Sequence, residues 1–256
     1  MASEGSDRST RHPAALNAPA DAITIPRPDP AGPAEDTRWA RKHKAIMERG
    51  LATFLEKGYA SSSMDEIAAL AEVSKQTIYK HFADKEGLYY AIVLDMIAGA
   101  YGRFLPSIRL LSEDDDVVEG LLTFGRILNV TLLQPRMVQL RRLIIAEANR
   151  FPDLGALYYE ETHGRTIELL ATALQRHVER GNLSIDDPHM AAHQLCWLIF
   201  GIPRNKVMLC GDDVSYTQQE LEDFADAGIR TFLAAHDPSR GDASRAQPQP
   251  PAQSSS

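Results

Sequence analysis

Residues 73–85, VSKQTIYKHFADK, contain two helix starts close together in the chain. Ser74 and Asp84 are residue types that cap a helix by accepting a hydrogen bond from a backbone amide in its first turn. Just upstream, Ser63 and Glu66 have the spacing of a capping box, in which each side chain bonds the backbone amide of the other residue. The stretch therefore predicts a short helix on either side of a tight turn, followed by the start of a further helix.

The helix that Ser74 caps is expected to bury one side and to present the other. At about 100° per residue, Ile78 and Phe82 fall on one side of it, whereas Gln76 and Lys80 point the opposite way. The small core expected beneath it consists of Ile67, Leu70, Val73, Ile78 and Phe82. A helix supported in this way projects from the protein as a rigid rod.

The outer side of this helix carries residue types that read DNA. An α-helix fits the major groove, where Gln can bond an adenine edge, Thr can contact a thymine methyl group, and Lys can reach guanine or a phosphate. The preceding helix would then lie across the DNA backbone. Periodicity alone leaves a second interpretation open, a plain helical hairpin whose outward Lys, Gln and His side chains are solvated.

The longer stretch IMERGLATFLEKGYASSSMDEIAALAEVSKQTIYKHFADKEGLYYAIV, residues 46–93, resembles the DNA-binding domain of the TetR family of transcriptional regulators. The spacing IA..A.VSK.T.Y.HF..KE.L carries the resemblance, which implies a homodimer, commonly a repressor released by a small molecule. Glu72 stands where the family usually has Gly in the turn, at a cost of about 1 kcal/mol if the turn needs a positive φ. The candidate DNA-contacting residues are Ser63, Lys75, Gln76, Thr77, Tyr79, Lys80, His81 and Lys85.

Composition and charge limit the remaining possibilities. The 256 residues are 44% hydrophobic and carry a net charge of −8, which argues against indiscriminate binding to nucleic acid. Residues 36–90 nevertheless contain nine Lys and Arg against eight Asp and Glu, so the negative charge lies elsewhere. No apolar run of about 18 residues and no leader-like N-terminus are present, which predicts a soluble cytoplasmic protein. Two cysteines, Cys196 and Cys210, are expected to be reduced thiols.

Apolar residues recur at helical spacing through most of the chain, and strand signals are nearly absent, which predicts an all-α protein. Helices are expected over 37–57, 64–71, 75–82, from 85 onward, and over 120–133, 135–150, 154–180, 188–209 and 217–235. The predicted domains are a disordered tail over 1–35, a three-helix helix-turn-helix domain over 36–84, a larger helical ligand-binding and dimerisation domain over 85–237, and a disordered tail over 238–256.

The larger domain has more apolar surface than one helix seam uses, which favours an internal cavity. Its stretch MVQLRRLIIAEANRFPDLGALYYE, residues 137–160, resembles the ligand-binding half of the AefR-like subgroup of TetR regulators, without naming a ligand. The candidate lining residues are Phe104, Phe124, Leu128, Ile144, Tyr158, Tyr159, His163 and Trp197. Each of them could instead be an ordinary core residue.

The last two helices carry long apolar edges, which predict a four-helix dimer interface about a two-fold axis. The candidate interface residues are Leu195, Leu198, Ile199, Ile202, Leu221, Phe224, Ala225, Ile229 and Phe232. Packing within one chain is the alternative.

The chain has no phosphate loop, nucleophile elbow or paired-carboxylate motif, so neither an enzyme nor a cofactor is predicted. His189 and His193 have the spacing of a shared metal site, but two ligands do not make one, and no metal is predicted.

Together these features predict a homodimeric repressor that binds a near-palindromic operator in double-stranded DNA and is released by a small apolar or aromatic effector. Two alternatives stay open. One is a DNA-binding regulator that acts through protein partners, with no small-molecule ligand. The other is a helical metal protein that uses His163, His189 or His193.

Overall fold

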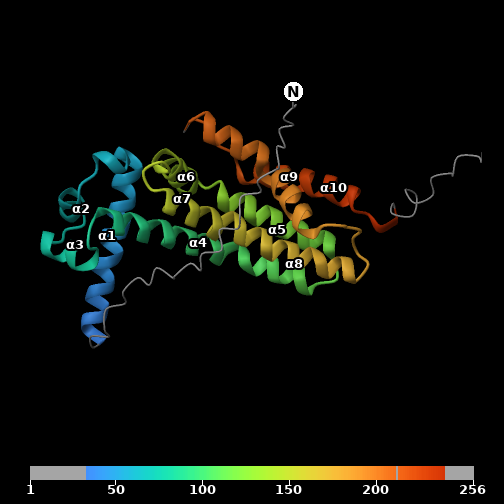
Figure 1. Ribbon diagram of the computed structural model, residues 1–256, viewed down its shortest axis with the longest axis horizontal. Helices are drawn as coiled ribbons and strands as arrows, with labels where there is room; N and C mark the ends of the chain where they lie inside the picture. The colour runs from blue at the N-terminus through green and yellow to red at the C-terminus, as the bar shows by residue number, and fades with distance from the viewer. Residues whose placement is uncertain (1–32, 212, 240–256) are drawn as a thin grey trace, which may run out of the picture.

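The structure is a computed structural model that describes residues 33–211 and 213–239. The predicted tails, 1–35 and 238–256, lie outside these residues except for 33–35 and 238–239. Every regular element in the described part is a helix, which confirms the all-α class. Figure 1 shows an elongated molecule with its first three helices at one end and a larger helical body beyond them.

The first helices form a small domain from which a long helix leads into the body. Their bounds are α1 Pro33–Ser61, α2 Met64–Leu70, α3 Lys75–His81 and α4 Lys85–Glu113. Gly58, with φ 76° and ψ 167°, interrupts the regular path of α1 at the predicted end of the first helix, although α1 begins earlier than expected. Lys85–Glu113 is the one unbroken helix in the described residues that is long and apolar enough to span a membrane. It packs against α1, α5 and α8, so this composition also suits a core helix.

The larger body contains the remaining helices, which are α5 Val117–Leu132, α6 Pro135–Glu147, α7 Pro152–Tyr159, α8 Arg165–Glu179, α9 Pro188–Leu209 and α10 Gln218–Ala235. The single helix predicted over 154–180 is continuous but contains a π-helical turn, Glu160–Gly164, between α7 and α8. A π-helical turn adds one residue to the helix and is frequently found at functional sites. Helical periodicity is too coarse to reveal such an insertion.

One hydrophobic core runs through both parts, from Ile46 on α1 to Phe232 on α10. At the far end, α9 and α10 approach closely at Gly228, where an added Cβ would lie 2.6 Å from the carbonyl oxygen of Leu198. No side chain fits that space, so the contact fixes the two helices against each other. The predicted core of the small domain is wrong for Leu70, which is 47% exposed at the end of α2, while the neighbouring Ala71 is buried in its place.

Candidate functional site

The three predicted caps hold the small domain together. Ser63 Oγ accepts from the amide of Glu66 at 3.2 Å, and Ser74 Oγ accepts from the amide of Thr77 at 3.1 Å. Asp84 caps α4 in the same way. The reciprocal half of the Ser63 capping box is wrong, because the Glu66 carboxylate pairs with Lys57 on α1 instead. This ion pair ties the first turn of α2 to α1.

The turn between α2 and α3 requires a left-handed residue. Glu72 has φ 55° and is the one non-glycine residue with positive φ among those described. Its amide donates to Ala69 O at 3.2 Å, and the amide of Val73 donates to Ala68 O at 3.0 Å. The turn is therefore the one that glycine would favour, and Glu72 adopts it at a cost of about 1 kcal/mol.

The outer face of α3 is exposed over the predicted contact residues. Lys75, Gln76, Tyr79 and Lys80 are exposed, whereas Ile78 beneath them is fully buried. Lys75 Nζ lies 2.5 Å from a carboxylate oxygen of Asp65. Because this pair is exposed, the lysine can exchange the carboxylate for a phosphate at little cost.

Thr77 and Ser63 have hydroxyls that already make hydrogen bonds within the protein. The Thr77 side chain is half-buried, and its hydroxyl lies 2.8 Å from Ser74 Oγ. Ser63 is exposed, although its hydroxyl already caps α2. Both hydroxyls keep a lone pair or a proton for a further hydrogen bond.

His81 lies against the protein, not on the outer face of α3. Its ring centroid is 4.6 Å from that of Trp39 and 5.6 Å from that of His43, both on α1. Burial, with smaller contributions from His43, Lys42 and Lys80, lowers the pKa of His81 to about 4. The imidazole is therefore neutral at physiological pH and joins α3 to α1 by ring packing. Its Nδ1 is buried without a hydrogen-bond partner.

Lys85 also has protein partners. Its ammonium donates to the carbonyl oxygens of Tyr59 and Ser62, each at 2.8 Å, and to that of Ala60 at 3.4 Å. It also lies 4.4 Å from the centre of the Tyr59 ring. Burial, followed by the charge of Arg150, lowers the pKa of Lys85. Lys85, predicted to contact DNA, is thus held at the end of α1, where its ammonium joins the last turn of this helix to the start of α4.

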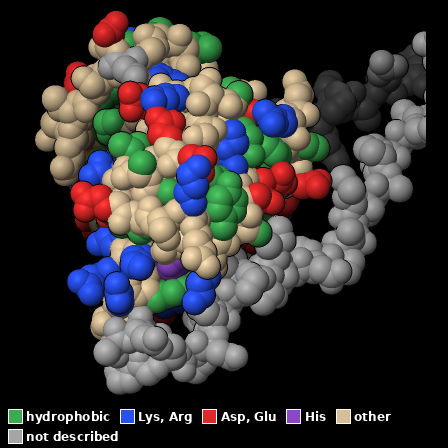
Figure 2. Space-filling view, turned by 90° about the vertical axis from the view of Figure 1, so that its left-hand side faces the viewer, with side chains coloured by type: hydrophobic (Ala, Val, Ile, Leu, Met, Phe, Trp, Pro, Cys, Tyr) green, Lys and Arg blue, Asp and Glu red, His purple; other side chains and the backbone are tan. Residues whose placement is uncertain are grey.

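A further set of cations lies next to α3 and was not among the predicted contact residues, although the run RWARKHK at 38–44 signals it. Arg38, Arg41 and Lys44 on α1 are exposed, and the Trp39–His81 contact brings this part of α1 beside the end of α3. Figure 2, which looks onto this end of the molecule, shows Lys and Arg side chains gathered toward its lower edge. The local charge therefore differs in sign from that of the whole chain.

The larger domain contains two adjacent cavities between α4, α6, α7 and α9. The outer one has a volume of about 450 Å³ and the inner one about 40 Å³. The structure brings Phe104, Leu128, Ile144, Tyr158, Tyr159, His163 and Trp197 to these two cavities. Phe124 lines neither of them and is a fully buried core residue.

Arg141 and Arg204 line both cavities, but neither was among the predicted lining residues. Arg204 lies four residues after Phe200 and three before Val207, both on the buried side of α9. A charged residue at that position in an apolar stripe is the signal that could have identified it. Arg141 on α6 carries no comparable signal.

The predicted dimer interface is largely wrong at the level of residues. Six of its members are buried within the chain and cannot reach a partner: Leu195, Ile199, Leu221, Ala225, Ile229 and Phe232. Leu198 and Ile202 are 40% and 68% exposed, and Phe224 is half-buried against Tyr216. Met190 and Trp197 of α9 are exposed as well. Periodicity finds the apolar edge of a helix but not which neighbour covers it.

The histidines of the alternative metal site form a packed group. His163 Nε2 lies 3.3 Å from His193 Nδ1, and His189 Nε2 lies 3.0 Å from a carboxylate oxygen of Glu168. Within residues 33–211 and 213–239, no group of three or more His, Cys, Asp or Glu side chains has the arrangement of a metal site. The geometry therefore does not support the metal alternative in this part of the chain.

The sequence matches two family profiles along most of its described length. Residues 46–92 match the profile described as "Bacterial regulatory proteins, tetR family". Residues 119–238 match the profile described as "AefR-like transcriptional repressor, C-terminal domain". The two matches divide the chain at α4, where the structure joins its small domain to its larger body.

Solved structures and characterised proteins resemble the chain over the same region. A TetR-family transcriptional regulator from Mesorhizobium loti MAFF303099 is 38% identical, with a TM-score of 0.72, covering 78% of this chain and 98% of that one. The flavonoid-responsive regulator FrrA is 31% identical, with a TM-score of 0.64 and the same coverage. The HTH-type transcriptional regulator UidR of Escherichia coli K12 is 29% identical over 161 residues, covering 61% of this chain and 77% of UidR.

Proposed function

The chain belongs to the TetR family of bacterial regulatory proteins, which are DNA-binding transcriptional regulators, and on that premise we propose that it is a cytoplasmic, homodimeric repressor released from its operator by a small molecule. The observation that carries the proposal is the exposed polar face of α3, held on a buried base at Ile78. In this proposal Gln76 reads a base edge in the major groove, and Tyr79 and Lys80 contact the DNA on either side of it.

Phosphate contacts would come from two helices. Lys75 and Lys80 on α3 and Arg38 and Arg41 on α1 are exposed at the same end of the molecule. Cations that neutralise phosphates supply affinity without sequence preference and fix the protein's register on the duplex. Lys85 would act differently, as a positioning residue that holds the end of α1 against the start of α4.

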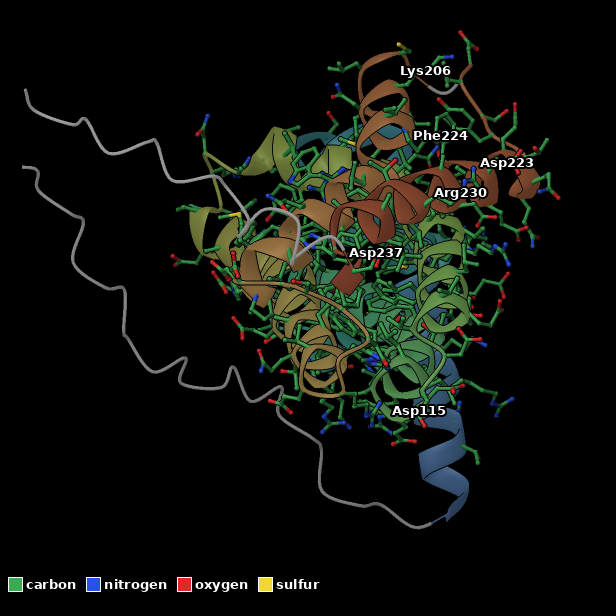
Figure 3. All side chains as sticks on the ribbon, turned by 90° about the vertical axis from the view of Figure 1, so that its right-hand side faces the viewer. Asp115, Lys206, Asp223, Phe224, Arg230 and Asp237 are labelled. Carbon is green, nitrogen blue, oxygen red and sulfur yellow. The ribbon has the colours of Figure 1, made fainter. Side chains whose placement is uncertain are left out.

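Dimerisation would use the outer side of α9 together with α10. Leu198 and Ile202 offer an exposed apolar surface on α9. Figure 3 faces this end of the molecule, where Asp223 and Arg230 are labelled along α10. These exposed opposite charges are separated by two helical turns on one face, so a two-fold axis can bring Asp223 opposite the partner's Arg230. The surface is thus suited to self-association.

Two recognition helices in such a dimer must fit half-sites one helical turn apart, about 34 Å. A ligand that changes this separation would release the DNA, provided that it binds the non-matching conformation more tightly.

A packed aromatic cluster between the larger body and the DNA-binding domain would transmit the change. Phe151, just before α7, has its ring centroid 4.8 Å from Tyr59 on α1 and 5.9 Å from Tyr89 on α4. The adjacent Pro152 lines the outer cavity, so the cavity wall and the DNA-binding domain share a contact.

The effector itself is supported as a small aromatic molecule by two observations. The cavity walls carry Phe104, Tyr158 and Trp197. The similar regulator FrrA is described as flavonoid-responsive.

Selection of bound fragments from random duplex DNA by the purified protein tests the proposal. We expect enrichment of a near-palindrome whose half-sites are about one helical turn apart, bound by a dimer in sedimentation experiments. Enrichment of no sequence, or of a single half-site bound by a monomer, would contradict it.

A further inference from the structure

The two cavities of the larger domain share a wall with an unusual charge. The shared lining residues are Arg141, Tyr158, Thr162, His163 and Arg204. Among the described residues that line either cavity there is no Asp or Glu. Two guanidinium groups thus line the cavities with no carboxylate among the lining residues.

Arg204 is the more enclosed of the two arginines. Its side chain is half-buried, and its guanidinium carbon lies 4.3 Å from the ring centre of Phe200 and 4.7 Å from that of Trp197. Burial, followed by the charge of Arg141, lowers the pKa of Arg204 to about 10, so the group stays charged at neutral pH. Both the nearby like charge and the loss of water destabilise this cation. An anion placed between the two arginines would offset both costs, because it would neutralise the repulsion and accept hydrogen bonds in place of water.

The remaining walls suit a flat, mostly apolar molecule. Arg141 lies 5.8 Å from the ring centre of Tyr158, and Trp197 lines the outer cavity. The outer volume of about 450 Å³ lies in the range of small-molecule sites. Aromatic faces and guanidinium planes both stack on planar rings.

The π-helical turn Glu160–Gly164 gives the site its polar edge. Thr162 and His163, both in this turn, line both cavities. The hydroxyl of Tyr101 donates to Thr162 O at 2.8 Å and lies 3.0 Å from Thr166 Oγ1, which fixes the turn from the side of α4. The turn therefore places hydrogen-bonding groups next to the two cations.

We infer that this site binds an aromatic anion, with its carboxylate or ionised phenol between Arg141 and Arg204 and its rings against Tyr158 and Trp197. The inference deepens the proposed function, on which it rests, by assigning the chemical class of the effector. Rings that reach inward would press on Phe104 of α4, the helix that begins in the DNA-binding domain. The anionic group of the effector would give binding its selectivity, and its rings would couple binding to the DNA-binding domain.

Matched pairs of acids and amides test the inference on the full-length protein. The probes are benzoate, 2-naphthoate and biphenyl-4-carboxylate, each compared with its neutral amide by titration calorimetry. We expect at least one acid to bind at least about ten-fold more tightly than its amide, because a charge-assisted pair is lost in the amide. Arg204→Met and Arg141→Met should each remove this preference, and Arg109→Met, an exposed residue of α4 outside the cavity, should preserve it.

The outcomes separate this inference from the proposed function. Equal binding of every acid and its amide, or no binding of any acid, overturns the inference even if the arginine variants fail to fold. Release of labelled operator DNA is measured with the same probes. Acid-selective binding without operator release would leave the inference standing and would refute release by a small molecule. Release by an amide as readily as by its acid would refute the inference alone.

Discussion

Replacing Lys85 by Met separates two roles for this residue. The resemblance to TetR regulators implies a cation that faces operator DNA, whereas the structure shows its ammonium bound by the carbonyl groups of Tyr59, Ala60 and Ser62. Met keeps an unbranched apolar stem of similar length and removes the charge and all three donors. A hydrogen bond to a charged group contributes about 1.5–3 kcal/mol to stability. Because Lys85 is partly exposed, we expect the three bonds together to contribute about 2–3 kcal/mol, and the variant to lose this amount of unfolding free energy.

Urea unfolding at fixed protein concentration, followed by circular dichroism, measures this loss, and a lower melting temperature should accompany it. The matched control is Lys44→Met. Lys44 is an exposed lysine of α1 whose pair with Glu48 spans 3.9 Å, so its loss should change stability by less than about 0.5 kcal/mol. A Lys85 variant that unfolds like the wild type and instead loses DNA affinity, with the slope of log affinity against log salt reduced by about one, would refute the positioning role.

Three further predictions concern separate surfaces. Burial keeps His81 neutral with a pKa near 4, below its unfolded value of about 6.5, so stability should fall as the pH drops from 6.5 toward 4. At about pH 5 the loss of unfolding free energy should be at most roughly 2 kcal/mol before solvent screening. Urea unfolding measures it, and the unfolding midpoint of His81→Phe should change less with pH than that of the wild type. Ile202→Glu should shift sedimentation toward the monomer with helix content unchanged, whereas Leu110→Glu on α4 should leave the dimer intact. An Ile202 variant that stays dimeric would contradict the proposed interface. Arg38→Ala should reduce the slope of log affinity against log salt by about one, and an unchanged slope would exclude it from the phosphate contacts.

Local features of the small domain could be predicted from the sequence because they depend on neighbouring residues. Ser63, Ser74 and Asp84 cap the helices that follow them, since a cap needs only its own side chain and the next turn. The positive φ of Glu72 belongs to the same class, because the family motif marks that position as a tight turn. The exposed face of α3 follows from helical periodicity once Ile78 is buried.

Contacts between distant residues could not be predicted in this way. His81 and Lys85 are polar residues that periodicity leaves outward, yet partners on α1 hold both of them. On α10, Ile229 faces α5 and α9, not a partner chain, which the order of helices in the sequence does not reveal. The proximity of Arg141 to Arg204 also depends on how α6 and α9 pack. In each case the missing information is the orientation of one helix relative to another.

The proposed function depends on base edges being read by the outer face of α3. Binding of Gln76→Ala to a set of operators, each with one base pair changed, tests this reading, with the exposed Gln175→Ala on α8 as control. We predict a loss of about 1–3 kcal/mol on the native operator and relaxed preference at one base pair of each half-site, with the others unchanged. An equal loss on every sequence, or no loss on any, would contradict the claim.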